Sequence, residues 1–241
     1  MEELIRVTLI GLFFGTFGTT LGGIIGIACK STSKKFLSFI LALASGLMMS
    51  IVCFDLIPEA LEITNIINTL LGILLGIITM IFCNILVEKK LQTNKNTMLK
   101  TGIIVSLGLA IHNFPEGLAI GSGMEASFKL GINLAIAICL HDIPEGISMA
   151  VPMKAGGISK IRIIIYIILS GITTGVGAFW GAIVGKVSVT VIGICLSFAA
   201  GAMLYIVSGE LIPEANNLYR GKMTALGNIL GILLGILVTL N

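Results

Sequence analysis

Charge is scarce in this sequence of 241 residues, because Asp, Glu, Lys and Arg together make up only 11% of it. A soluble domain carries roughly 25% of these residues. Hydrophobic residues make up 56% of the sequence, and a soluble chain of this length cannot bury so much apolar surface. The composition therefore indicates a protein that folds in lipid. The net charge is +3 with no basic run, which argues against nucleic acid as a partner.

Cysteine is also sparse, and its pattern excludes a disulfide framework and a zinc knuckle. The five cysteines form no CxxC pair, and all fall within or at the ends of apolar stretches, where a cysteine ordinarily packs as a small hydrophobic side chain. They are Cys29, Cys53, Cys83, Cys139 and Cys195. The first apolar run follows the mixed-charge sequence MEELIR, which favours a retained spanning helix over a cleaved signal peptide.

The long hydrophobic runs predict eight transmembrane helices in an all-α polytopic membrane protein. A helix needs about 20 apolar residues to cross the hydrocarbon layer. The qualifying stretches lie at about 7–29, 36–58, 66–87, 101–122, 130–151, 163–185, 189–212 and 224–240. The connections between them are too short for a separate soluble domain, so residues 1–241 are expected to form a single transmembrane domain.

Lysine and arginine predict the orientation of these helices. The side that holds both termini carries three of them, and the other side carries twelve. The three are Arg6, Lys129 and Lys186. Because basic loops stay on the cytoplasmic side, the sequence predicts extracellular termini and cytoplasmic basic loops.

An internal repeat relates the first three predicted helices to the last three. Residues 41–60 read LALASGLMMSIVCFDLIPEA, and residues 196–215 read LSFAAGAMLYIVSGELIPEA, at an offset of 155. The two related helices are five crossings apart and run in opposite directions, so the repeat is inverted. The expected plan is 3 + 2 + 3, with helices 4 and 5 between the repeats. Secondary transporters commonly place a site at the midplane of such a plan, although a repeat can also serve stability alone.

Acidic residues occur in or at the edges of the predicted spans, and no lysine or arginine lies inside any span. An ionisable group at the bilayer centre costs at least about 2.5–3.5 kcal/mol on insertion scales. Such carboxylates must be protonated, hydrated or neutralised by a cation, so a path for cations or protons is the natural interpretation. They are Asp55, Glu59, Glu116, Asp142, Glu145, Glu210 and Glu214.

Two matched motifs predict the centre of that path. Helix 4 carries HNFPEG at 112–117 and helix 5 carries HDIPEG at 141–146, and these motifs contain the only two histidines. In each motif the His and the Glu are four residues apart and share a helical face. Both histidines lie about twelve residues into their spans, near mid-membrane. The predicted ligands are His112, Asn113, Glu116, His141, Asp142 and Glu145. Such a nitrogen and oxygen set suits zinc, iron(II) or manganese.

The remaining carboxylates form two pairs that the repeat places at opposite mouths of the path. Asp55 and Glu59 end helix 2 near the outer face, and Glu210 and Glu214 end helix 7 near the inner face. We interpret them as groups that attract the ion and strip its water. The alternative is that they are interfacial helix-end carboxylates with ready access to water.

The sequence resembles the ZIP family (Zrt/Irt-like proteins) of divalent-metal transporters, bacterial type. The resemblance covers nearly the whole chain and rests on HNFPEG, HDIPEG, ELIPEA and the 3 + 2 + 3 plan. It implies a central metal site on helices 4 and 5, formed by the six residues named above. It also implies movement of the ion into the cytoplasm, an elevator-like motion of the helices that bear the site, and a homodimer.

Two further positions are compared with the family pattern. Met48 matches a helix 2 methionine near the first of two metals that family members often hold. Thr174 stands in SGITTGVGA where such members often have a glutamate. Because threonine is a weaker, neutral ligand, the second metal site is expected to be incomplete.

The expected function is therefore transport of divalent transition-metal ions, zinc first and then iron, manganese or cadmium, across the cell membrane. No catalytic cofactor and no enzymatic activity are expected, and the partners are the ions and the lipid bilayer. Two alternatives stay open. An intramembrane metal-dependent hydrolase would use the metal to activate water, although the sequence has no HExxH. A metal sensor would bind without flux.

Overall fold

The computed structural model describes the backbone of residues 2–29, 33–92 and 97–239, and the side chains of residues 2–29, 33–86 and 110–238. Every regular element in these residues is a helix, which confirms the all-α prediction. The elements are α1 (Glu2–Ala28), α2 (Lys34–Ile51), η1 (Val52–Leu56), α3 (Ile57–Ile63), α4 (Ile66–Gln92), α5 (Thr97–Ala126), α6 (Phe128–Ala155), α7 (Lys160–Gly185), α8 (Val189–Ile206), η2 (Val207–Leu211), α9 (Ile212–Leu218) and α10 (Lys222–Thr239).

Six helices of the described residues are long and apolar enough to cross a membrane, which agrees with the prediction of a membrane protein. They are Glu2–Ala28, Lys34–Ile63, Ile66–Leu86, Phe128–Ala155, Lys160–Gly185 and Val189–Leu218. A shorter apolar helix covers Lys222–Val238, and the side chains of the first part of α5 lie outside the described residues. Most helices extend a few residues beyond the predicted spans, because a helix continues past its apolar stretch until a cap ends it.

Serine caps mark three of these helix starts. Ser33, Ser127 and Ser188 each adopt an extended backbone and accept a hydrogen bond from the N–H three residues later. An accepting side chain satisfies one of the first N–H groups of a helix, which have no partner within it. Local chemistry therefore fixes the starts of α2, α6 and α8.

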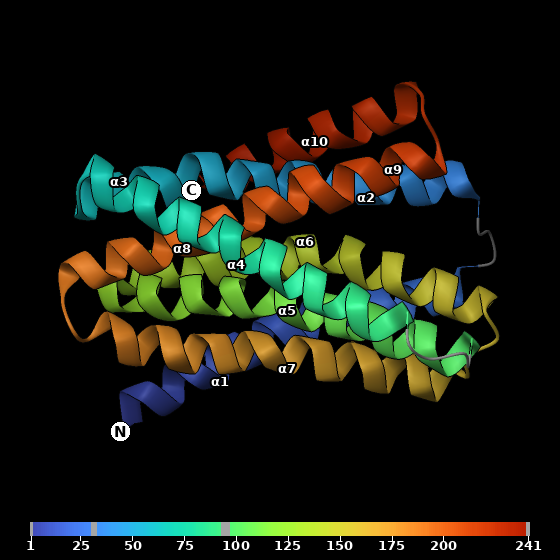
Figure 1. Cartoon of the computed structure of the whole chain (residues 1–241), viewed down its shortest axis with the longest axis horizontal. Helices are drawn as coiled ribbons and strands as arrows, with labels where there is room; N and C mark the ends of the chain where they lie inside the picture. Colours follow the sequence, from blue (N-terminus) through green and yellow to red (C-terminus); the bar gives the residue numbers. More distant parts are fainter. Residues whose placement is uncertain (1, 30–32, 93–96, 240–241) are drawn as a thin grey trace.

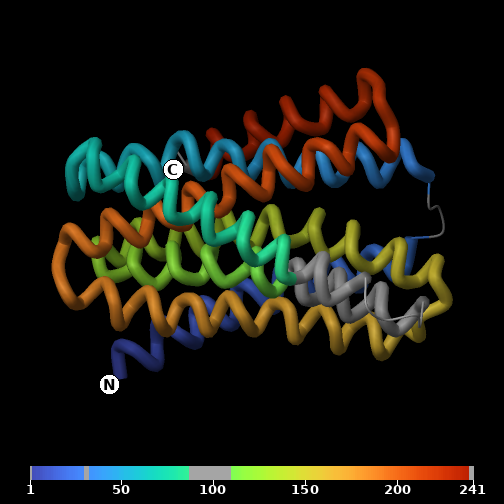
Figure 2. Tube along the Cα trace, in the orientation of Figure 1, coloured from blue at the N-terminus to red at the C-terminus, as the bar shows by residue number. Residues whose placement is uncertain are grey.

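The helices form two bundles that pack side by side (Figure 1). We call α1, α5, α6 and α7 the site bundle, because it carries both His motifs. The remaining elements form the flanking bundle, in which α2 packs on α10 and α4 packs on α8. The main contacts between the bundles are those of α5 with α8 and of α2 with α6. The Cα trace shows that successive long helices run back and forth along one common direction (Figure 2).

Glycine allows the helices within each bundle to approach closely. On α1, a Cβ atom at Gly22 would overlap the carbonyl oxygen of Ile143 on α6, and one at Gly146 on α6 would overlap the carbonyl oxygen of Thr19 on α1. Glycines also bring α5 against α7 and α2 against α10. Small residues are the usual means of close helix packing in lipid, where no hydrophobic force drives helices together.

Replacing Gly22 by alanine is expected to destabilise the protein by about 1–3 kcal/mol, the usual cost of overpacking. The added methyl group meets backbone rather than a flexible side chain, so the two helices must separate. Thermal unfolding in detergent measures the effect. Gly156→Ala is the control, because its nearest neighbour would be the Pro152 carbonyl oxygen at 3.4 Å. Equal stability of the two variants would contradict the packing argument.

Polar contacts join neighbouring helices of the site bundle at both of its ends. At one end, the Lys186 ammonium lies 3.1 Å from a Glu3 carboxylate oxygen and 3.6 Å from one of Glu125, which joins α7 to α1 and α5. At the other end, Lys154 of α6 donates a hydrogen bond of 2.6 Å to the Ile27 carbonyl oxygen of α1. These contacts hold the four helices as one unit.

The contacts between the two bundles differ in kind from the contacts within each bundle. Leaving Asp55 and Leu237 aside, every side-chain hydrogen bond and ion pair between helices in the described part of the chain links two helices of one bundle. The interface between the bundles is instead a buried apolar cluster. It includes Ala119, Ile120, Ala137 and Ile138 of the site bundle and Met48, Ala199, Ala200 and Met203 of the flanking bundle.

Two π-helical segments interrupt the flanking bundle at equivalent places. η1 (Val52–Leu56) follows α2, and η2 (Val207–Leu211) follows α8, again at an offset of 155. At the end of each segment an N–H bonds to the carbonyl five residues earlier, as in Ile212 to Val207. The segments hold Asp55 and Glu210 at the same position. The sequence analysis did not anticipate this wider helical turn, which recurs in proteins at functional sites.

Candidate metal centre

The two His motifs lie on adjacent helices of the site bundle. α5 carries His112 and Glu116, and α6 carries His141 and Glu145. Each helix continues through the proline of its motif, Pro115 in α5 and Pro144 in α6. The proline cannot donate the backbone hydrogen bond of its turn. The sequence predicts that this leaves the carbonyl groups of Ile111 and Leu140 without their usual helical partner.

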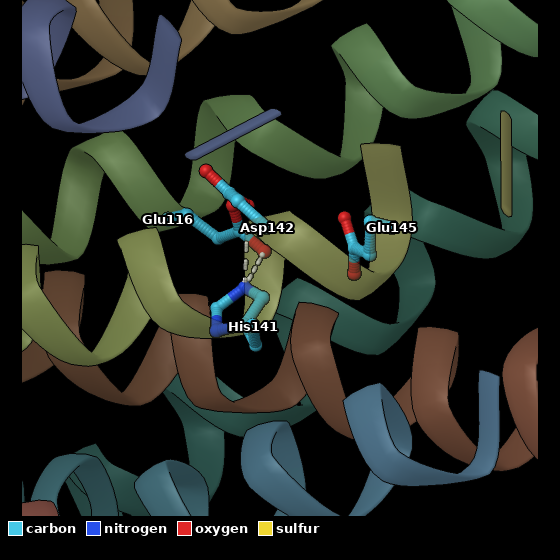
Figure 3. A group of neighbouring side chains, drawn as sticks. All are labelled: Glu116, His141, Asp142 and Glu145. Atoms are coloured by element: carbon cyan, nitrogen blue, oxygen red, sulfur yellow. Dashed lines mark hydrogen bonds and ion pairs between the residues drawn. The ribbon is translucent and has the colours of Figure 1, made fainter. Parts of the chain in front are cut away.

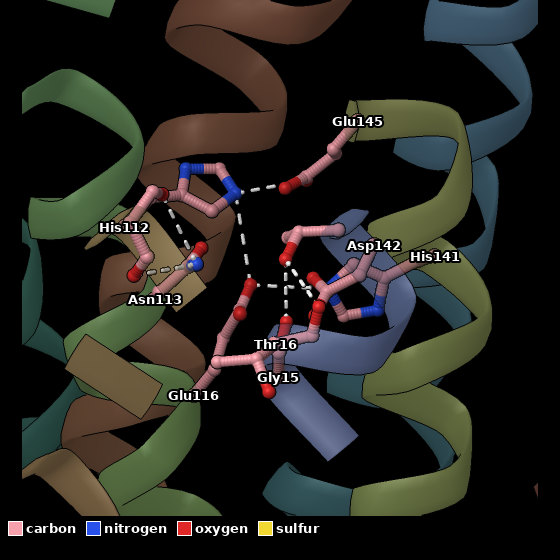
Figure 4. Close-up of polar contacts among 10 residues, drawn as sticks. Gly15, Thr16, His112, Asn113, Glu116, His141, Asp142 and Glu145 are labelled. Carbon is pink, nitrogen blue, oxygen red and sulfur yellow. Dashed lines mark hydrogen bonds and ion pairs between the residues drawn. The ribbon is translucent and has the colours of Figure 1, made fainter. Parts of the chain in front are cut away.

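The histidines and glutamates pair across the two helices (Figure 4). His112 Nε2 lies 3.0 Å from Glu145 Oε1, and His141 Nε2 lies 3.0 Å from Glu116 Oε1. Glu116 Oε1 is also 3.6 Å from His112 Nε2, so this carboxylate lies between the two imidazoles. The crossed pairing brings both motifs into one group, as expected from their matched depth.

Four of these residues converge tightly enough to hold an ion. Each of Glu116, His141, Asp142 and Glu145 offers one ligand atom, and these atoms lie within 4.8 Å of one another. In Figure 3 the carboxylates of Glu116 and Asp142 face the His141 ring, and Glu145 lies on the next turn of α6. His112 adds a second imidazole from α5. The structure thus brings together five of the six predicted ligands, all except Asn113, on α5 and α6.

The group is buried, and many of its oxygens have no partner. Five of the six predicted ligands are 0% exposed, and His112 is 4% exposed. The oxygens of this group that have no hydrogen-bond partner among the described residues are Asn113 Oδ1, Glu116 Oε2, both carboxylate oxygens of Asp142, and Glu145 Oε2. Asp142 Oδ1 lies 3.6 Å from His141 Nε2. Buried polar atoms nearly always find a hydrogen-bond partner, so such a cluster demands an explanation. No lysine or arginine is buried in the part of the chain that the structure describes.

Asn113 has a fixed orientation. Its amide nitrogen lies 3.2 Å from the Ser170 carbonyl oxygen and 3.4 Å from Ser170 Oγ, both on α7. This leaves Asn113 Oδ1 free to accept a cation. Sequence analysis did not identify Ser170 as the residue that orients this amide, because a serine in an apolar helix has no distinguishing pattern.

Thr174 lies on α7, one turn after Ser170. Its side chain is fully buried against Gly15 of α1, and its hydroxyl has no hydrogen-bond partner among the described residues. Figure 4 shows Gly15 and Thr16 beside Glu116 and Asp142. Thr174 is therefore placed on the α1 and α7 side of the group, as a neutral hydroxyl.

The other predicted residues lie outside the central group. Met48 is fully buried in the apolar cluster between the bundles. Asp55 and Glu59 are half-buried near the start of α3, whereas Glu210 and Glu214 are exposed near the start of α9. α3 and α9 lie at opposite ends of the molecule (Figure 1), so the two carboxylate pairs occupy opposite ends.

Sequence analysis missed Asn84, which contacts Glu210, and Tyr205, which contacts Asn84. The amide nitrogen of Asn84 on α4 lies 2.7 Å from Glu210 Oε1 and 3.3 Å from the Tyr205 hydroxyl on α8. The one available signal was Asn84 itself, an amide within the apolar run IFCNILV.

Comparison with known proteins adds to this geometry. The sequence model of the family described as "ZIP Zinc transporter" matches residues 87–240, more than half of the chain. The chain is similar to the zinc transporter ZupT of Shigella dysenteriae serotype 1 (strain Sd197), with 31% identity over 124 residues, 47% of this chain and 48% of that protein. It is also similar to the zinc transporter ZupT of Salmonella paratyphi A (strain ATCC 9150 / SARB42), with 30% identity over 125 residues and the same shares.

The chain spans about half the length of the curated relatives it matches, 48% in both cases. The family match rests on the second part of the chain, which contains both His motifs, α7 and the repeat that ends in ELIPEA. The match agrees with the resemblance to the ZIP family that these motifs indicate. By its sequence, the chain belongs to the ZIP zinc transporter family.

Proposed function

We propose that this protein carries divalent transition-metal ions, zinc above all, across the cell membrane into the cytoplasm. One observation carries the proposal: two imidazoles and three carboxylates converge in the buried centre of an apolar helical bundle. Several of their oxygens have no partner, and no buried cation balances them within the described residues. A transported divalent cation supplies both the charge and the missing contacts. Mixed nitrogen and oxygen ligands suit zinc, iron(II), manganese and cadmium.

We propose the six residues of the two His motifs as the ligands of the transported ion. His112 and His141 supply nitrogen, and the side chains of Glu116, Asp142 and Glu145 supply carboxylate oxygen. Asn113 supplies an amide oxygen that Ser170 orients. The neutral Thr174 supports a single high-affinity ion, because it adds no charge to balance a second one. Binding requires deprotonated ligands, so it releases protons from this group.

We propose that the site bundle moves as a unit against the flanking bundle. Its helices interlock through glycines and are tied at both ends by Lys154 and Lys186. The interface with the flanking bundle is apolar and includes many alanines, and sliding along such a surface breaks few polar contacts. This motion would expose the central ligands to each side of the membrane in turn.

The eight-span topology and the inverted repeat belong to this proposal. Residues 1–241 would form one transport domain, with both termini extracellular and the basic loops cytoplasmic. The π-helical segments η1 and η2 support the repeat, because they recur at its offset of 155. We also expect a homodimer. Light scattering of the purified protein in detergent measures its oligomeric state and tests this expectation.

The carboxylate pairs at the two ends would serve the path. Asp55 and Glu59 would attract the ion on the outer side, and Glu210 and Glu214 would receive it on the inner side. Among the six central ligands, His112 alone has measurable exposure, 4%.

Zinc uptake into sealed proteoliposomes that contain a trapped zinc indicator tests the proposed function. We expect saturable uptake, with iron(II), manganese and cadmium as competitors whose order gives the selectivity. Tight zinc binding by the purified protein without flux would contradict transport and favour a metal sensor. A turnover product formed while the metal stays bound would favour a hydrolase.

A further inference from the structure

A pocket of about 340 Å³ lies between α2, α9 and α10 of the flanking bundle. Its polar lining consists of Ser45, Asn216, Arg220, Thr224 and Asn228, and alanines, a glycine and Ile212 line the rest. None of the six central ligands lines it, and no carboxylate of the described residues does either. The pocket therefore offers hydrogen-bond donors and one positive charge to a ligand other than the transported cation.

Hydrogen bonds between the three helices hold the walls of this pocket in place. The Ser38 hydroxyl of α2 lies 2.7 Å from the Ala215 carbonyl oxygen of α9 and 2.7 Å from the Thr224 hydroxyl of α10. Asn228 Nδ2 on α10 donates a hydrogen bond of 2.9 Å to Ser45 Oγ on α2. An amide nitrogen carries two hydrogens, so this contact leaves one of them for a ligand. The pocket is thus preformed rather than assembled around its ligand.

Positive charge lies beside the pocket without a carboxylate to balance it. Arg220 is exposed and lines the pocket, and Lys222 follows it by two residues. Neither forms an ion pair among the described residues. The Lys35 ammonium of α2 lies 5.7 Å from the centroid of the Tyr219 ring, so the start of α2 adds a third cation at this end of the molecule. A guanidinium group pairs well with phosphate oxygens, which favours a ligand that carries phosphate.

An apolar series on α10 begins at the pocket. Ala225 lines the pocket, and Ile229, Ile232 and Ile236 follow it at spacings that keep them on one face of the helix. Ala225 and Ile229 are exposed, and the other two are half-buried. At 1.5 Å per residue the series runs for about 16 Å, close to half of the roughly 30 Å hydrocarbon layer of a bilayer. It therefore matches the length of an acyl chain in one leaflet.

We propose that this pocket binds the phosphate headgroup of an anionic membrane lipid, whose acyl chain lies along the apolar series of α10. Arg220 pairs with the phosphate, and Asn228 donates a further hydrogen bond from the wall of the pocket. A lipid uses both the donors and the apolar series, whereas a free phosphate ion would use the donors alone. In the proposed topology this end of the flanking bundle faces the cytoplasm, so the lipid belongs to the inner leaflet. The inference does not depend on metal binding.

The test is lipid binding to the purified full chain in neutral detergent, measured by native mass spectrometry. The probes are phosphatidylglycerol and phosphatidylcholine with identical acyl chains. Phosphatidylglycerol should bind about fivefold more tightly, because unbalanced basic residues favour an anionic lipid. Arg220→Gln should lower its affinity about tenfold, the effect of losing a hydrogen bond to a charged group. Asn228→Ala should cause a smaller loss.

Arg162→Gln is the matched control. It removes the same charge from an exposed position near the start of α7, in the site bundle, and should bind phosphatidylglycerol like the wild type. An equal loss in Arg162→Gln, wild-type affinity in Arg220→Gln, or equal binding of the two lipids would each overturn the inference. Soluble glycerol phosphate separates a lipid from a free phosphate. It should bind at least tenfold more weakly than phosphatidylglycerol, since it lacks the acyl chains, and binding as tight as that of the lipid would overturn the assignment to a lipid.

Discussion

Replacing Glu116 and Glu145 together by glutamine is expected to abolish saturable zinc uptake and to weaken zinc binding by at least about 100-fold. These two carboxylates pair with the two imidazoles, at 3.0 Å from His141 and from His112. A neutral amide keeps the shape of the side chain but removes the negative charge that balances the cation. Loss of residues that merely support a metal ligand already costs about 10–100-fold in affinity, so the loss of two ligands should exceed this.

The measurement is zinc uptake into proteoliposomes, paired with equilibrium binding to the purified protein. The control is the double substitution Glu2→Gln with Glu62→Gln, which removes the same number of carboxylates from exposed positions of α1 and α3. It should transport at nearly the wild-type rate. Retention of saturable uptake in the Glu116 and Glu145 variant would show that the ion does not bind between α5 and α6.

Cross-linking the two bundles is expected to stop transport completely, whereas cross-linking within the site bundle should leave it intact. Ile40 on α2 and Ile147 on α6 share one buried cluster across the bundle interface. Met153 on α6 and Ile163 on α7 share a cluster inside the site bundle. A covalent link across the interface prevents the site bundle from moving, and a link within it does not.

The experiment starts from a variant in which the five native cysteines are replaced by serine or alanine and that still transports zinc. Cysteine pairs are then introduced at each of the two places and joined by a reducible cross-linker. Uptake by the α2–α6 pair should disappear on cross-linking and return on reduction. Unchanged uptake with a fully cross-linked α2–α6 pair would rule out relative motion of the bundles.

Local patterns in the sequence were sufficient for the helical class and for the candidate ligands. The matched motifs HNFPEG and HDIPEG place His and Glu on one helical face, because residues four apart lie one turn apart. Their equal depth predicts that they face each other, and the structure brings Glu116, His141, Asp142 and Glu145 together. The apolar runs likewise predict long membrane helices, although they underestimate helix length, since capping rather than hydrophobicity ends a helix.

Tertiary structure alone decided which partners meet. Periodicity tells which face of a helix carries a residue, but it does not tell how far the next helix is rotated. His112 therefore pairs more closely with Glu145 of α6, at 3.0 Å, than with Glu116 of its own helix, at 3.6 Å. The contact of Asn113 with Ser170 depends in the same way on the packing of α5 against α7.

The same distinction applies to the whole molecule. The sequence by itself determined a membrane-embedded all-α chain with two buried His motifs and a repeat at an offset of 155. Only the tertiary structure decided the division into two bundles, the π-helical turns at Asp55 and Glu210, and the contact of Asn84 with Glu210. The physical reason is that apolar helices in lipid have many near-equivalent partners. Close glycine contacts and a few buried polar pairs select one arrangement among them.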